Sequence, residues 1–112
     1  MSERSQSANI AATVVLLIVH GLLLGATVVL LGLFVMATDP CGSVRCGDPA
    51  WIDRAMKLGI WTGAAIFFID LVVAGYLLTR RKAAFVVPII GCVTQVGLAI
   101  GAAAMESLAG PV

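Results

Sequence analysis

Three long apolar runs, separated by two shorter polar stretches, dominate the pattern of hydrophobic and polar positions along this chain. A helix needs roughly 20 apolar residues to cross a hydrocarbon core about 30 Å thick, and each run is long enough. We expect transmembrane helices over about residues 10–37, 56–79 and 83–105, with a loop over residues 38–55. The pattern predicts an all-α membrane protein. Residues 1–112 would form a single integral membrane domain, a small bundle of three transmembrane helices with one extracytoplasmic loop.

The composition supports this class and excludes several kinds of function. Of the 112 residues, 61% are hydrophobic and 12% are charged, about half the charge of a soluble domain. The net charge of +1 comes without a basic tract interleaved with aromatic residues, so we expect no binding to nucleic acid. The sequence contains no phosphate-binding loop, nucleophile elbow or HExxH helix, and its single histidine cannot supply both axial ligands of a haem. We therefore expect neither enzymatic activity nor a cofactor.

A cluster of positive charge between the second and third runs predicts the orientation in the membrane. Arg80, Arg81 and Lys82 are consecutive, and short loops rich in Lys and Arg stay on the cytoplasmic side during insertion. This rule places the N-terminus in the cytoplasm. The loop over residues 38–55 and the C-terminus would then lie outside a cell membrane that the chain crosses three times.

The first apolar run has a second interpretation, as a cleaved signal peptide. Its length of about 27 residues exceeds the 7–15 residues usual for the apolar part of such a peptide. We interpret the run as a retained helix, with cleavage as the alternative.

Two cysteines in the predicted outer loop support the same orientation. Cys41 and Cys46 lie five residues apart in a stretch rich in turn-forming residues, so they can approach within disulfide distance. Disulfides persist in oxidising compartments, whereas a cytoplasmic location would favour a thiol pair or half of a metal site. No second cysteine pair or nearby histidine completes a metal site. We predict an extracytoplasmic disulfide and no bound metal.

Small residues recur at helical spacing within the runs, a pattern that marks faces where membrane helices approach closely. Asp70 follows Gly63 by seven residues, which returns to within about 20° of the same helix face. We therefore expect Asp70 on the packing face of its helix. One stripe of the third helix holds Gly91, Gln95 and Ala102. The glycines predicted to mediate helix packing are Gly21, Gly25 and Gly32 in the first helix, Gly59 and Gly63 in the second, and Gly97 and Gly101 in the third.

One polar side chain in each helix falls at a similar depth. At 1.5 Å per residue, His20, Asp70 and Gln95 lie roughly 16, 15 and 20 Å from the predicted cytoplasmic ends of their helices. A carboxylate in hydrocarbon costs roughly 2.5–3.5 kcal/mol on insertion scales, so Asp70 needs a partner, a cavity or a proton. In a purely structural role, His20 donates to Asp70 and Gln95 satisfies the remaining lone pairs. Two alternatives are the docking of Asp70 on a basic residue of another subunit and a proton or cation pathway.

These features lead to three hypotheses for function. The first is an accessory or assembly subunit of a larger respiratory or cell-envelope complex, in which His20, Asp70 and Gln95 form the intramembrane contact set. Its partners would be other membrane-protein subunits, or further copies of itself, within the lipid bilayer. The second is a homo-oligomeric proton or ion channel, or a transporter, that uses Asp70 and His20. The third is an envelope sensor whose disulfide-closed outer loop meets a partner.

Overall fold

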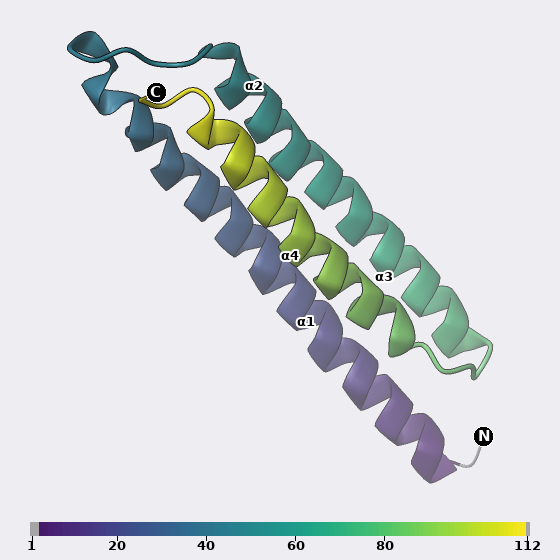
Figure 1. Cartoon of the computed structure of the whole chain (residues 1–112). Helices are drawn as coiled ribbons and strands as arrows, with labels where there is room; N and C mark the ends of the chain where they lie inside the picture. The colour runs from purple at the N-terminus through teal and green to yellow at the C-terminus, as the bar shows by residue number, and fades with distance from the viewer. Residues whose placement is uncertain (1–2, 112) are drawn as a thin grey trace.

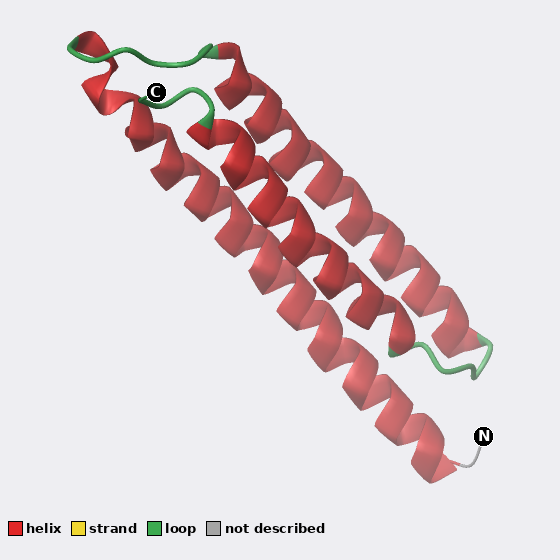
Figure 2. Ribbon diagram, in the orientation of Figure 1, coloured by secondary structure: helices red, strands yellow, loops and turns green. Residues whose placement is uncertain are grey.

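The computed structural model describes residues 3–111 and consists of three helical rods packed side by side (Figures 1 and 2). The first rod is α1 (Glu3–Phe34), extended by the 3₁₀ segment η1 (Val35–Gly42). The second joins α2 (Ala50–Lys57) to α3 (Gly63–Thr79) through the π-helical segment η2 (Leu58–Thr62), and the third is α4 (Val86–Ser107). Each rod is long and apolar enough to cross a membrane, so the predicted fold class is confirmed.

Large apolar side chains cover the outside of the bundle, while most of the buried side chains are small or polar. Leu22, Phe68 and Val93, one from each rod, are 67–69% exposed. The buried polar residues are Asn9, Thr13, His20, Thr27, Asp70, Gln95 and Glu106. A surface of this kind suits a lipid environment, in which an apolar exterior carries no penalty and polar groups pair between helices. In water, apolar patches of this extent mark sites of association.

Glycines on the inner faces make room for larger side chains from neighbouring helices. A Cβ atom on Gly59 would lie 2.2 Å from Leu31 Cδ1, so the leucine of α1 occupies the notch that this glycine leaves. Leu31 is fully buried and packs with Ala55 and Ala102. One turn further along, Gly63 faces the amide of Gln95. This is the close approach expected of small residues in membrane helices.

The other predicted packing glycines divide into two groups. Gly21 is half-buried, and a Cβ atom there would lie 3.4 Å from the Phe67 ring. The remaining four are exposed, with no atom within 4 Å of a Cβ built on them: Gly25, Gly32, Gly97 and Gly101. These four make no close helix contact within the chain. Their role in packing stays a prediction for contacts with other helices.

A side chain of α1 holds the turn between α3 and α4. Asn9 Nδ2 donates to Lys82 O at 2.8 Å, and Asn9 Oδ1 accepts from Ala84 N at 3.0 Å. These two bonds hold residues 82–84 in a non-helical turn, so α4 begins at Val86 rather than at the predicted residue 83. Pro88 lies in the first turn of α4, where its missing N–H has no cost.

The basic cluster forms the end of α3. Arg81 adopts a left-handed conformation with φ of 54°, and Arg81 N and Lys82 N donate to Leu78 O and Leu77 O. This hydrogen-bond pattern is a Schellman motif, which closes helix C-termini and here has arginine where glycine is usual. Arg80, Arg81 and Lys82 are all exposed beyond the end of the apolar rod.

The opposite end of the bundle carries the predicted disulfide, which is confirmed: Cys41 and Cys46 are bonded, with Cα atoms 5.6 Å apart. The chain re-enters a helix at Ala50, whose N–H donates to Asp48 Oδ1 at 2.9 Å, so the connection is shorter than the predicted loop over residues 38–55. The C-terminal segment runs back beside this loop (Figure 1), and Gly47 N donates to Gly110 O at 3.1 Å. The two ends are called below the Asn9 end and the disulfide end.

Candidate functional site

The site consists of two ionisable side chains that meet near the middle of the bundle. His20 Nδ1 of α1 and Asp70 Oδ2 of α3 lie 2.5 Å apart and share a hydrogen bond. The His20 side chain is fully buried, and that of Asp70 is 3% exposed. The structure therefore brings together two of the three residues that matching depth had placed in one cluster.

Helical spacing turns both side chains inward. On α1, His20 lies seven residues after Thr13 and seven before Thr27, and all three are buried. Seven residues correspond to nearly two full helical turns, so these polar groups share one face of the helix. Asp70 likewise shares its face with Gly63, as predicted, and with Ala74. The inner face of α1 is thus a polar stripe, and the charge of α3 faces it.

Two further residues lie against the pair, Gly91 from α4 and Phe67 from α3. A Cβ atom on Gly91 of α4 would lie 2.7 Å from Asp70 Oδ2 and 2.9 Å from His20 Nδ1, so only glycine fits against the pair. The Phe67 ring of α3 packs edge-on against the imidazole, with centroids 5.1 Å apart. The sequence placed Gly91 in a small-residue stripe, but no pattern marked Phe67.

Each partner of the pair keeps one polar atom without a hydrogen bond in the described structure: His20 Nε2 and Asp70 Oδ1. The bond between Nδ1 and Oδ2 accounts for one proton, and a further proton on Nε2 would make the pair neutral overall. Loss of that proton leaves one net negative charge among apolar side chains. The number of protons on the two side chains therefore decides whether the pair carries a net charge.

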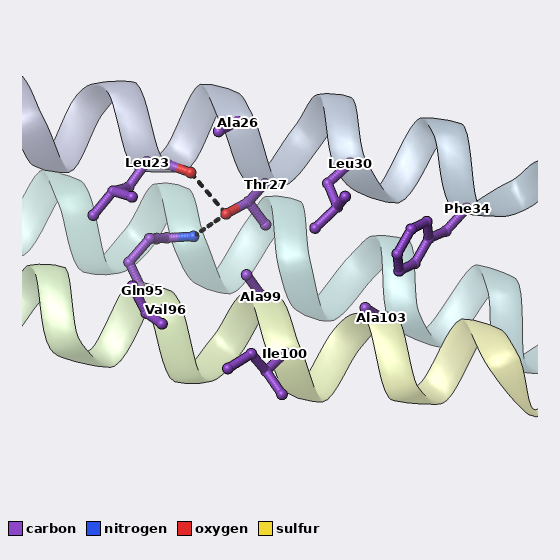
Figure 3. Close-up of a pocket in the computed structure, with 10 residues that line it drawn as sticks. All are labelled: Leu23, Ala26, Thr27, Leu30, Phe34, Gln95, Val96, Ala99, Ile100 and Ala103. Carbon is purple, nitrogen blue, oxygen red and sulfur yellow. Dashed lines mark hydrogen bonds between the residues drawn. The ribbon is translucent and has the colours of Figure 1, made fainter.

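Gln95 does not join the pair, contrary to our expectation that it would satisfy Asp70. Its Nε2 donates to Thr27 Oγ1 at 2.9 Å, and Thr27 Oγ1 donates to Leu23 O at 2.7 Å (Figure 3). The reason is axial position, because Gly91 is the α4 residue level with the pair. Gln95 lies one helical turn, about 6 Å, further toward the disulfide end. Its Oε1 has no partner and faces Gly63.

An apolar groove of about 410 Å³ runs between α1 and α4 on the disulfide side of this bond (Figure 3). The Thr27–Gln95 hydrogen bond lies toward one end of the groove, and Phe34 and Ala103 lie toward the other. Its walls are apolar, and the amide of Gln95 is itself fully buried. The groove offers shape and apolar surface but no exposed hydrogen-bonding group.

A second buried carboxyl group escaped the sequence analysis. Glu106 near the end of α4 is 1% exposed, and neither of its carboxylate oxygens has a partner. The predicted helix ends at residue 105, so Glu106 falls outside it. The spacing of Glu106 indicates that it is buried, because it lies four residues after Ala102 on the same helix face as Gly91 and Gln95.

Among residues 3–111, no group of three or more His, Cys, Asp or Glu side chains is placed to hold a metal ion. A scan against protein-family models, a search of curated proteins and a search of solved structures each found no match. The geometry of the His20–Asp70 pair is therefore the feature of this chain that bears most directly on its function.

Proposed function

We propose that this chain is a three-span membrane protein that binds a proton within the bilayer at the His20–Asp70 pair, as one component of a larger or self-associated membrane assembly. The observation that carries the proposal is the hydrogen bond between Nδ1 and Oδ2 in a fully buried setting, with Nε2 and Oδ1 left unpartnered. Buried ionisable groups in membrane helices frequently belong to proton or ion pathways.

The energetics favour the form of the pair that carries no net charge. A net charge near the centre of a hydrocarbon layer costs roughly 2.5–3.5 kcal/mol on insertion scales, whereas a protonated imidazole beside a carboxylate is neutral as a pair. The atom that gains or loses the proton is His20 Nε2, since the proton shared by Nδ1 and Oδ2 remains between the two side chains. Histidine suits this role because its ordinary titration range includes neutral pH.

Movement of a proton across the membrane would need more than one chain. Toward the disulfide end, Leu31 fills the Gly59 notch and packs with Ala102, so the interior there is closed by side chains. Alternating access in transporters likewise uses repeats or bundles that move against one another. The pair therefore fits a proton-binding component better than a complete pathway.

This geometry disfavours one of the hypotheses drawn from the sequence and leaves the others open as proposals. Docking of Asp70 on a basic residue of another protein is disfavoured, because the chain's own helices cover the carboxylate and His20 occupies it. An accessory role through other surfaces, and a sensing role for the disulfide loop, remain proposals. We also retain the orientation in which Arg80, Arg81 and Lys82 are cytoplasmic, on the positive-inside rule.

The single histidine allows a direct test. Protein labelled with ¹⁵N-histidine in lipid bilayers carries one imidazole, so its nitrogen resonances report His20 alone. We expect a strongly hydrogen-bonded Nδ1 proton and a pH-dependent change at Nε2 by one proton. In Asp70→Asn the strongly hydrogen-bonded Nδ1 resonance should be lost, because the charged acceptor of that bond is gone.

Asp53→Asn is the matched control, since Asp53 is exposed and pairs with Lys57 outside the bundle core. This variant should leave the histidine titration unchanged. An imidazole whose protonation stays constant over the pH range in which the helices persist would overturn the proposal. That result would leave the pair a purely structural contact between α1 and α3.

A further inference from the structure

Glu106 is a buried ionisable group that the proposed function does not use. Its carboxyl is almost completely enclosed, and both oxygens lack partners. No charged side chain from the described elements around it is buried with it. The charged residues of α2, η1 and the following loop are all exposed: Asp53, Arg54 and Lys57, then Asp39, and Arg45 and Asp48. A carboxyl without partner or counter-charge in such a place is suited to bind a proton.

The C-terminal segment and the disulfide loop contact each other at this end of α4. Residues 108–111 follow Glu106 and run beside the disulfide loop. Gly47 N donates to Gly110 O, and the backbones of Cys46 and Pro111 pair in an isolated antiparallel β-bridge. The fit is tight, because a Cβ atom on Gly47 would lie 1.7 Å from Leu108 O. We call the disulfide loop (residues 41–47) together with residues 108–111 the cover.

The disulfide determines the shape of the cover. It closes a ring between Cys41 and Cys46, and both cysteines contact the C-terminal segment. Cys41 Sγ lies 3.8 Å from Ala109 O, while Cys46 pairs with Pro111. Opening the ring frees the backbone on either side of these contacts, and exposed loops of this kind open locally without unfolding the rest of a protein.

We propose that Glu106 is a second proton-binding carboxyl, and that the Cys41–Cys46 disulfide keeps it covered. This inference goes beyond the proposed function and does not depend on His20 or Asp70. In the oxidised protein the cover excludes water from the carboxyl. After reduction the cover opens and Glu106 exchanges its proton with the aqueous phase.

The reductant is a dithiol, by class. One of its thiolates attacks a sulfur of the disulfide, and its second thiol resolves the mixed disulfide. Two electrons and two protons pass to Cys41 and Cys46, which become thiols, while the dithiol becomes a disulfide. No other co-reactant is needed.

Carbodiimide labelling of the full chain in detergent or lipid tests the inference. A protonated carboxyl adds across the C=N bond of a carbodiimide, and the O-acylisourea rearranges to a stable N-acylurea that peptide mass spectrometry locates. With a water-soluble carbodiimide at mildly acidic pH, we expect slow labelling of Glu106 in the oxidised protein. After treatment with dithiothreitol the rate should rise at least about tenfold, as for a group released by local opening.

Three controls separate the cover from general loosening of the bundle. A double variant, Cys41→Ser with Cys46→Ser, should label rapidly without reductant. Cys92→Ser should respond to dithiothreitol as the wild type does, because Cys92 is the free thiol of α4. Asp70 serves as an internal reference and should stay unlabelled in both redox states, since it lies away from the cover among three helices.

Two results would overturn the inference. Equal labelling rates at Glu106 in the oxidised and reduced proteins would mean that the disulfide does not control access. A rise at Glu106 accompanied by an equal rise at Asp70 would mean that reduction loosens the whole bundle. Neither result bears on the titration of His20, so failure here is distinguishable from failure of the proposed function.

Discussion

Asp70 and Glu106 are both carboxyl side chains buried inside the bundle, but their surroundings differ at every contact. Asp70 lies near the middle, bonded to His20 and bordered by Gly91 of a third helix. Glu106 lies near the disulfide end, where neither oxygen has a partner. One carboxyl has a specific partner from another helix, and the other is only enclosed.

The difference illustrates two ways in which a membrane bundle can bury a carboxyl group, with a partner and without one. The Asp70 site is made from side chains of α1 and α3 and from the Gly91 backbone of α4, so the three rods meet there at one level. The Glu106 carboxyl has no hydrogen-bond partner on another helix, so no polar contact there fixes the alignment of the rods. Variants at the two sites should therefore affect stability by different amounts and with opposite signs.

The largest effect is expected from Asp70→Ala. It leaves His20 buried without its partner, and breaking a buried ion pair in this way costs about 3–5 kcal/mol. Unfolding of the detergent-solubilised protein by sodium dodecyl sulfate, followed by circular dichroism, measures the loss. Asp53→Ala is the control and should unfold with the wild type. A loss below about 1 kcal/mol would mean that the pair behaves as an ordinary interhelical hydrogen bond.

A smaller effect is expected from Gly91→Ala. The added methyl group would lie within 3 Å of both members of the pair, and forcing an atom into a packed site costs about 1–3 kcal/mol. The matched control is Gly97→Ala on the outer face of the same helix, where nothing lies within 4 Å. The same unfolding assay should show a change of no more than about 0.5 kcal/mol for this control. Equal losses for both variants would show that Gly91 is not packed tightly against the His20–Asp70 pair.

Glu106→Met should change stability in the opposite direction. Replacing an unpartnered buried carboxyl with an apolar side chain of similar length removes a desolvation cost. We expect a gain of about 1 kcal/mol or less, since replacement of buried charges by apolar groups is often neutral or stabilising. The measurement is the shift in unfolding midpoint. A clear destabilisation would show that Glu106 has a partner, and the contrast with Asp70 would fail.

The smallest effect is expected from Thr27→Val, which removes the hydrogen bond with Gln95 while nearly keeping the side-chain volume. Interhelical hydrogen bonds in membrane bundles contribute about 0.6 kcal/mol on average, so the loss should be of that size. Comparison with Asp70→Ala in the same assay ranks the two polar contacts. A loss equal to that of Asp70→Ala would place Gln95 on a par with the pair.

Several parts of this picture were predictable from the sequence. The lengths of the apolar runs set the three rods, and the seven-residue interval between Gly63 and Asp70 placed both on one inner face. The similar depths of His20 and Asp70 anticipated their contact. The spacing of Cys41 and Cys46 within a turn-rich stretch predicted their disulfide. Each of these predictions uses distances along the chain, which helix geometry converts directly into positions.

Other parts were not predictable by the same means. Gln95 lies about one turn beyond the pair, and its choice of Thr27 as partner depends on helix rotation, which depth alone does not give. Asn9 donates one hydrogen bond to, and accepts another from, a turn more than 70 residues away. These two bonds delay the start of α4. Glu106 lies one residue beyond the predicted end of the third helix, and hydropathy gives no sign that its side chain is buried.

The sequence by itself determined that this chain is all-helical, that three rods suit a membrane, and which face of α3 carries Asp70. The tertiary structure decided that His20 bonds to Asp70 while Gln95 bonds to Thr27, that Gly91 borders the pair, and that Glu106 is enclosed. The physical reason is that helical periodicity and hydropathy are properties of a single helix. Contacts between helices depend on their rotation and axial offset, and an offset of one turn, about 5.4 Å, changes every partner.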